Sequence, residues 1–146
     1  MSVVLREFDG FKDWEWFTRH NPIKRVQDTS GITAVDAESG EILAIVVCDT
    51  WYSDSVNLHI VVTDNRIVRY GFMEAIFNYV FNNNKHENIK IAYGFIPTNN
   101  AKARKLIKNV GFTEVYTLSG GDGGVGFHIL TLDKKDCKFL KGNKHG

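Results

Sequence analysis

His59 is the side chain of this sequence best suited to accept a proton in catalysis, because an imidazole titrates near neutral pH. It lies in the run SVNLHIVV (55–62), whose apolar and β-branched residues predict a strand. Tyr93, in the run IKIAYGFI (89–96), lies on a second predicted strand and could donate a proton or form an aromatic wall. For both residues the alternative interpretation is structural, with the imidazole and the phenol ring packed in the sheet.

A second group of residues could bind an anion. The segment TDNRIVRYGF (63–72) leads from a predicted strand into a helix predicted over 68–81. Unpaired N–H groups at a helix N-terminus, together with the positive end of the helix dipole, bind phosphate. Arg66 and Arg69 add cationic side chains, and Gly71 lets the backbone approach a ligand closely. The alternative interpretation is an ordinary strand-to-helix turn with two solvated arginines.

The segment NNAKARKLIKNVGF (99–112) predicts a short helix with a signal at each end. Its apolar residues recur at i, i+3, i+4 and i+7, at positions Ala103, Leu106, Ile107 and Val110. Asn99 or Asn100 can cap the start, and Gly111 fits the left-handed residue that ends a helix, with Phe112 folding back onto Ile107. The polar face carries basic residues, among them Lys105, which are either solvated or placed near an anion.

Hydrophobic periodicity predicts the elements that position these residues. Strands are predicted at 2–8, 31–37, 41–49, 55–62, 89–96, 112–118 and 125–132. Helices are predicted at 11–20, 68–81 and 100–110. Ser39-Gly40 predicts a tight hairpin turn, and GGDGG predicts a hairpin loop between the last two strands. The pattern indicates a single α/β domain over residues 1–146, without repeat or linker.

The motifs occur in an order that resembles the GCN5-related N-acetyltransferases, the acetyl-CoA-dependent family abbreviated GNAT. In that family a strand-to-helix junction carries Gln/Arg-x-x-Gly-x-Gly/Ala. Arg66 and Gly71 match its first and last positions, and Arg69 replaces its first glycine. An asparagine that opens a short helix, closed by Gly-Phe, follows one strand later. The short loops and the incomplete glycine motif resemble the compact versions carried by bacteriophages.

The resemblance implies a GNAT-like (acyl-CoA N-acyltransferase) fold, with a mixed, mostly antiparallel central sheet flanked by helices. Acetyl-CoA would be the co-substrate, held where strands 55–62 and 89–96 diverge at a bulge. Strand 55–62 would pair with the pantetheine arm, and an N–H of Val61 or Val62 would hold the thioester carbonyl. The implied cofactor-binding residues are Ile60, Val61, Val62, Arg66, Arg69, Tyr70, Gly71, Phe72, Asn100 and Lys105.

The resemblance also implies the reaction, which moves an acetyl group from acetyl-CoA to a primary amine of an unidentified acceptor. His59 would act as the base and Tyr93 as the acid. Many family members carry a tyrosine that acts as the general acid seven residues after the motif asparagine, where this chain has Ile107. The aromatic and basic segment 11–20 would border the acceptor groove, or would only pack its helix onto the sheet.

Two alternative functions remain open at this point. The first is a catalytically silent protein with the same fold, used for binding or associated with a virion. The second is a small α+β module that binds nucleic acid through the basic helix. The net charge of +1 argues against the second, because duplex binding usually needs a concentrated basic face.

Composition limits the remaining possibilities. The 146 residues, 43% hydrophobic and 24% charged, are typical of one globular domain. Cys48 and Cys137 lack metal or redox spacing, which predicts free thiols in a reducing compartment and no metal. The N-terminal segment lacks a signal-peptide core, and no apolar run reaches ~18 residues. We expect a cytoplasmic protein of a bacterium or a phage-infected host, a monomer or homodimer without membrane contact, acting on a small-molecule or peptide amine.

Overall fold

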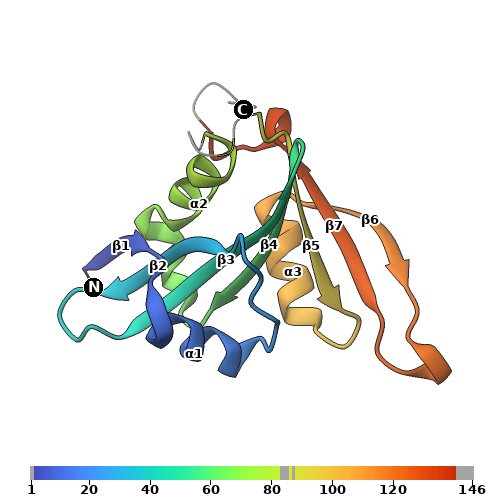
Figure 1. The fold of residues 1–146 in the computed structure, drawn as a ribbon, viewed down its shortest axis with the longest axis horizontal. Coiled ribbons are helices and arrows are strands. Elements are labelled where there is room, and N and C mark those ends of the chain that lie inside the picture. The colour runs from blue at the N-terminus through green and yellow to red at the C-terminus, as the bar shows by residue number, and fades with distance from the viewer. Residues whose placement is uncertain (1, 83–85, 87, 141–146) are drawn as a thin grey trace.

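The computed structural model describes residues 2–82, 86 and 88–140. Seven strands within them form a sheet in the order β1-β2-β3-β4-β5-β7-β6 (Figure 1). Neighbouring strands are antiparallel, except that β4 and β5 are parallel. The strands are β1 (Val3–Glu7), β2 (Ser30–Asp36), β3 (Ile42–Tyr52), β4 (Ser55–Val62), β5 (Ile91–Pro97), β6 (Thr113–Leu118) and β7 (Phe127–Asp133). The helices are α1 (Gly10–His20), α2 (Phe72–Phe81) and α3 (Ala101–Val110), with short 3-10 helices η1 (Asn65–Tyr70), η2 (Gly121–Gly123) and η3 (Lys134–Asp136). The predicted mixed, mostly antiparallel sheet is confirmed.

Helices cover both faces of the sheet at β3. On one face, Val46 of β3 shares the larger core with Phe77 of α2 and Val110 of α3. On the other face, Phe17 of α1 packs against Ile45 and Val47, the alternate residues of the same strand. Side chains of a strand point alternately to the two faces, so a strand covered on both sides reads as a continuous apolar run.

The aromatic residues of α1 pack this helix onto the sheet. Phe17 is fully buried, and the ring of Trp14 stacks beside it with centroids 6.3 Å apart. Phe8 meets the same indole edge-on, also at 6.3 Å. These contacts match the packing interpretation of the segment, while contact with an acceptor stays a prediction.

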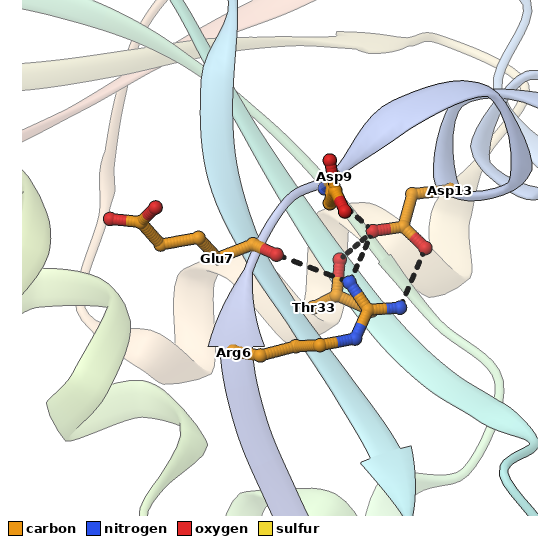
Figure 2. Close-up of polar contacts among 5 residues, drawn as sticks. All are labelled: Arg6, Glu7, Asp9, Asp13 and Thr33. Atoms are coloured by element: carbon orange, nitrogen blue, oxygen red, sulfur yellow. Dashed lines mark hydrogen bonds and ion pairs between the residues drawn. The ribbon is translucent and has the colours of Figure 1, made fainter.

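A buried carboxylate fixes the start of α1 against β1 and β2 (Figure 2). Asp13 is 1% exposed, and its two oxygens accept hydrogen bonds from the Arg6 guanidinium at 2.6 and 2.9 Å. It also accepts from the Thr33 hydroxyl at 3.0 Å and from the Asp9 N–H at 2.8 Å. A charged group left without partners in such a place would be strongly destabilising, so these four bonds compensate its burial.

Strands β4 and β5 pair over only three residue pairs, the last of which is Asn57 opposite Tyr93. Beyond this pair the strands diverge (Figure 1), which confirms the predicted separation. The predicted bulge is wrong, because β4 keeps an uninterrupted register against β3 from Asn57 to Val62. Since β5 stays paired with β7 over its full length, each strand follows the twist of its own part of the sheet.

The helix predicted over 68–81 is divided into two pieces. Asn65–Tyr70 forms the 3-10 helix η1, and α2 begins only at Phe72. Gly71 lies between them at φ +78°, a left-handed conformation that costs glycine little and other residues more. Asp64 caps η1 by accepting the N–H of Arg66 at 3.0 Å. Hydrophobic spacing could not reveal the break, because the buried stripe continues on both sides of it.

The ends predicted for α3 are confirmed. The Asn100 side chain caps the helix by accepting the N–H of Ala103 at 3.1 Å. Gly111 follows the last helical residue, and the N–H of Phe112 returns to the carbonyl of Ile107 at 3.2 Å. Beyond α3, the strands β6 and β7 form a hairpin that projects to one side of the molecule (Figure 1).

Candidate active site

The divergence of β4 and β5 leaves backbone groups unpaired at the centre of the sheet. From Leu58 to Val62, the edge of β4 that faces β5 has no strand partner within the described part of the chain. The strands are still close at the start of this segment, because a Cβ added at Gly94 would lie 3.3 Å from the Leu58 carbonyl oxygen. Free N–H and C=O groups in a sheet interior need partners, and an extended ligand can supply them.

His59 points toward a carboxylate on the neighbouring strand. Its Nε2 lies 3.0 Å from Oδ2 of Asp49, and the two side chains are 15% and 6% exposed. An ionised carboxylate only accepts hydrogen bonds, so in the neutral imidazole Nε2 carries the hydrogen and Nδ1 keeps the lone pair. Asp49 also accepts the Thr50 hydroxyl at 3.0 Å, which holds the carboxylate in place.

Tyr93 lies on the same face of the sheet as His59. It pairs with Asn57, and Asn57 and His59 are alternate residues of β4. The pKa of Tyr93 is raised above its ordinary value by burial, and further by the negative charges of Asp49 and Asp28. The phenol therefore keeps its proton at neutral pH and can donate it. The structure thus brings the two predicted catalytic residues to one place.

Two further polar residues of this face were not predicted. Asp49 and Asn57 face each other across β3 and β4, are 5% and 8% exposed, and flank His59. The signal was present in the sequence. Asn57 and His59 alternate along one predicted strand, and Asp49 ends the strand before it, so the hairpin brings all three to one face.

The predicted anion-binding segment lies at the turn from β4 into α2. The N–H groups of the first turn of α2 follow Gly71, and a Cβ added at Gly71 would meet no atom within 4 Å. The space above this glycine is therefore open to a ligand. Phe72 can contribute only its backbone, because its side chain is fully buried. The side chain of Tyr70 lies outside the described part of the structure.

The two arginines of this segment differ in their contacts. The Arg66 guanidinium donates to both carboxylate oxygens of Asp64, with its shortest bond at 2.7 Å, and is 67% exposed. These hydrogen bonds hold the pKa of Asp64 below its ordinary value. A phosphate would have to share Arg66 with this carboxylate. Arg69 lies at the end of η1 and is exposed.

The remaining predicted residues fall into two sets. Ile60, Val61 and Val62 lie half-buried on the part of β4 that has diverged from β5. The backbone groups of Ile60 and Val62 face the opening, whereas those of Val61 face β3, as the bond from the Thr63 N–H to the Leu43 carbonyl shows. Asn100 and Lys105 lie on α3, where Asn100 is occupied as a helix cap and Lys105 is exposed. The position at which many GNAT enzymes carry a tyrosine is Ile107, which packs against the core and cannot donate a proton.

The described residues show neither a metal-binding cluster nor a membrane-spanning helix. No group of three or more histidine, cysteine or acidic residues gathers there in a way that could hold a metal ion. Within the same ranges, none of the helices combines the length and apolar character that crossing a bilayer requires.

Comparison with known proteins finds similarity in structure but not in sequence. The sequence matches no protein-family profile, and it matches none of the curated proteins. The spermidine/spermine N-acetyltransferase SpeG of Vibrio cholerae superposes with a TM-score of 0.70 at 13% identity, covering 92% of this chain and 94% of that one. A structure assigned as a phosphinothricin N-acetyltransferase has a TM-score of 0.60 at 19% identity, over 90% and 98% of the two chains.

A third structure names the fold family directly. A Desulfovibrio desulfuricans protein assigned to the GNAT family of acetyltransferases has a TM-score of 0.65 at 12% identity, over 90% of this chain and 99% of that one. These superpositions agree with two features of the sheet, which are its strand order and the parallel pair of β4 and β5 that opens. This chain has the fold of the GCN5-related N-acetyltransferases.

Proposed function

We propose that this protein is an N-acetyltransferase that moves an acetyl group from acetyl-CoA to a primary amine. The observation that carries the proposal is the opening between β4 and β5, which begins beside His59 and leads toward the glycine before α2. The structural neighbours described as N-acetyltransferases support it at the level of the fold. The unpaired edge of Ile60 to Val62 fits an extended pantetheine arm, and the first turn of α2 fits a pyrophosphate.

The proposed roles follow from the polar residues at this opening. Acetyl-CoA supplies an acetyl group activated as a thioester. His59 takes the amine proton on Nδ1, while Asp49 holds Nε2 and fixes the orientation of the ring. Of the two expected donors, Val61 directs its N–H toward β3, because the N–H of Thr63, two residues on, bonds to Leu43 of that strand. The N–H of Val62 faces the opening and donates to the carbonyl oxygen, where negative charge develops. Tyr93 keeps its proton near neutral pH and gives it to the departing sulfur.

These roles balance the reaction. The amine enters the reaction in its uncharged form, after its ammonium has lost a proton to solvent. Its nitrogen forms a bond to the acetyl carbon as the bond from that carbon to sulfur breaks. One amine proton passes to His59, and the sulfur receives the proton of Tyr93. Exchange with solvent restores both side chains, so the products are an amide and the free thiol of CoA.

The first test is binding of acetyl-CoA to the purified protein. A ligand that binds only the folded state stabilises it, by about 2.7 kcal/mol at 100 times its Kd. We expect the melting temperature to rise by several degrees with acetyl-CoA. The absence of any shift at millimolar concentration would reject acetyl-CoA binding, and retention on DNA that weakens with salt would then favour the nucleic-acid alternative.

The second test is release of thiol in the presence of amines, with His59→Gln as the variant. Loss of a general base lowers kcat by about 10² to 10⁴-fold, whereas glutamine can still donate to Asp49. The matched control is His128→Gln, which changes a histidine of β7 that pairs with Ile96 of β5 and is bonded to Thr117 of β6. Binding of acetyl-CoA without release of thiol by any amine would favour the catalytically silent alternative.

A further inference from the structure

The polar side chains at the opening also indicate the charge of the acceptor, an inference that rests on the proposed acetyl transfer. Asp49, Asn57 and Tyr93 occupy adjacent positions on three neighbouring strands of one sheet face. Asp28 approaches the same place from the loop after α1, because its carboxylate accepts the backbone N–H groups of Thr50 and Trp51 at 3.1 and 2.9 Å.

Asn57 is short of a hydrogen-bond partner. The residue is 8% exposed, and its Oδ1 is buried without a donor among the residues that the structure describes. Buried polar atoms are nearly always hydrogen-bonded, so an orphaned acceptor needs an explanation. Asn57 lies between Asp49 and Tyr93 in the strand register, on the face where the proposed amine reacts. An N–H group of a ligand would satisfy it.

The charge at this place is negative. In the described ranges, neither Asp28 nor Asp49 forms an ion pair with a lysine or arginine, and His59 is the single basic partner of Asp49. The pKa of Tyr93 is raised by burial and then by both carboxylates, so the two charges act at the same point. A depression of about 510 Å³ adjoins the cluster, lined by Val26, Gln27, Asp28 and Thr50.

We propose that the acceptor carries a second positive charge besides the amine that is acetylated. The reacting amine lies at His59 and donates an N–H to Oδ1 of Asn57. The second cationic group lies in the depression beside Asp28, whose carboxylate is fixed by two backbone N–H groups. A cation gains attraction from both carboxylates and from the face of the Tyr93 ring, whereas an anionic group is repelled.

The test compares three acceptors of similar alkyl chain: hexamethylenediamine, hexylamine and ω-aminohexanoate. The amine that reacts is the same in each, and the far end is positive, apolar or negative. We expect kcat/KM to fall in that order, with about a tenfold difference between the diamine and the amino acid. An equal or reversed order overturns this inference while leaving acetyl transfer intact. No release of thiol with any of the three, and no thermal shift with acetyl-CoA, overturns both.

Two substitutions test the assignment of residues. Asp28→Asn should lower the preference for the diamine over hexylamine about fivefold, and Glu38→Gln, an exposed carboxylate in the turn between β2 and β3, should not change it. Asn57→Leu keeps the volume and removes the orphaned acceptor, so it should raise KM for the diamine without lowering the melting temperature. An unchanged diamine preference in Asp28→Asn would overturn the placement of the second cation.

Discussion

At the scale of single residues, the two buried carboxylates on the α1 face have different tasks. Asp13 is bonded to Arg6, Thr33 and the Asp9 N–H, which uses its hydrogen-bonding capacity within the protein (Figure 2). Asp49 bonds to a histidine beside an opening in the sheet. A carboxylate fully used by structural partners stabilises the fold, whereas one that holds an imidazole can serve a reaction.

We expect Asp13→Asn to lower the free energy of unfolding at pH 7 by about 1.5–3 kcal/mol, the range for hydrogen bonds to a charged group. Burial alone would raise the pKa of Asp13, but the hydrogen bonds from Arg6, the Asp9 N–H and Thr33 outweigh it and lower that pKa in the folded state. The carboxylate therefore stabilises the protein above its unfolded pKa, and this stability is lost as the pH falls through its folded pKa.

Urea denaturation between pH 7 and pH 3 measures both effects. The wild-type protein should lose stability more steeply at the acidic end than Asp13→Asn, which lacks this titrating group. Asp9→Asn is the matched control, because the Asp9 side chain is exposed and makes no cap bond, while its N–H to Asp13 is retained. Equal acid sensitivity of the wild type and Asp13→Asn would contradict the assignment.

At the scale of elements, the break between η1 and α2 decides what this segment can bind. A continuous helix over 68–81 would leave the N–H groups of residues 68–71 unbonded and bond those from Phe72 onward internally. The break at Gly71 instead starts α2 there, with unbonded N–H groups in its first turn. Arg66 lies in η1, directly before this break. This arrangement provides the features of a pyrophosphate site in a few consecutive residues.

We expect Arg66→Ala to weaken binding of acetyl-CoA about fivefold, and Lys105→Ala to change it less. Arg66 precedes the start of α2, whereas Lys105 lies on the exposed side of α3. Calorimetric titration at low and at high salt measures both variants, and the effect of Arg66→Ala should shrink with salt. Equal effects of the two substitutions would refute the assignment of the phosphates to the η1–α2 junction.

At the scale of the whole molecule, the sheet consists of two parts joined by the short β4–β5 ladder. Strands β1 to β4 form one part, and β5, β7 and β6 form the other. Since only three residue pairs connect them within the sheet, much of the joint depends on the helices packed across it. An extended ligand between β4 and β5 would continue the ladder and hold the two parts together.

Hydrogen exchange tests this expectation directly. Acetyl-CoA should slow exchange of the backbone N–H groups of Ile60 and Val62, and of those at the first turn of α2, by about tenfold or more. The paired strands β2 and β3 supply the internal control, because their N–H groups are already bonded and should change less. Protection confined to α3 or to the β6–β7 hairpin would place the ligand elsewhere.

The sequence alone determined the elements and most of their order, because local signals carry them. The alternation of the strands, the helical stripe of α3, and the Asn100 and Gly111 ends all act within a few residues along the chain. Local pattern also placed His59 and Tyr93 on strands and Arg66 before a helix. The resemblance built on these motifs anticipated the fold.

Only the tertiary structure decided which side chains meet and where the sheet opens. Asp49 and Asn57 became candidate site residues because strand pairing places them beside Tyr93. Asp28 joined them because its loop returns to β3 and bonds the Thr50 N–H. The absence of a bulge in β4 and the break at Gly71 arise because strand twist and helix packing are set by contacts distant in sequence. Periodicity measures one segment at a time, so it cannot register contacts between segments.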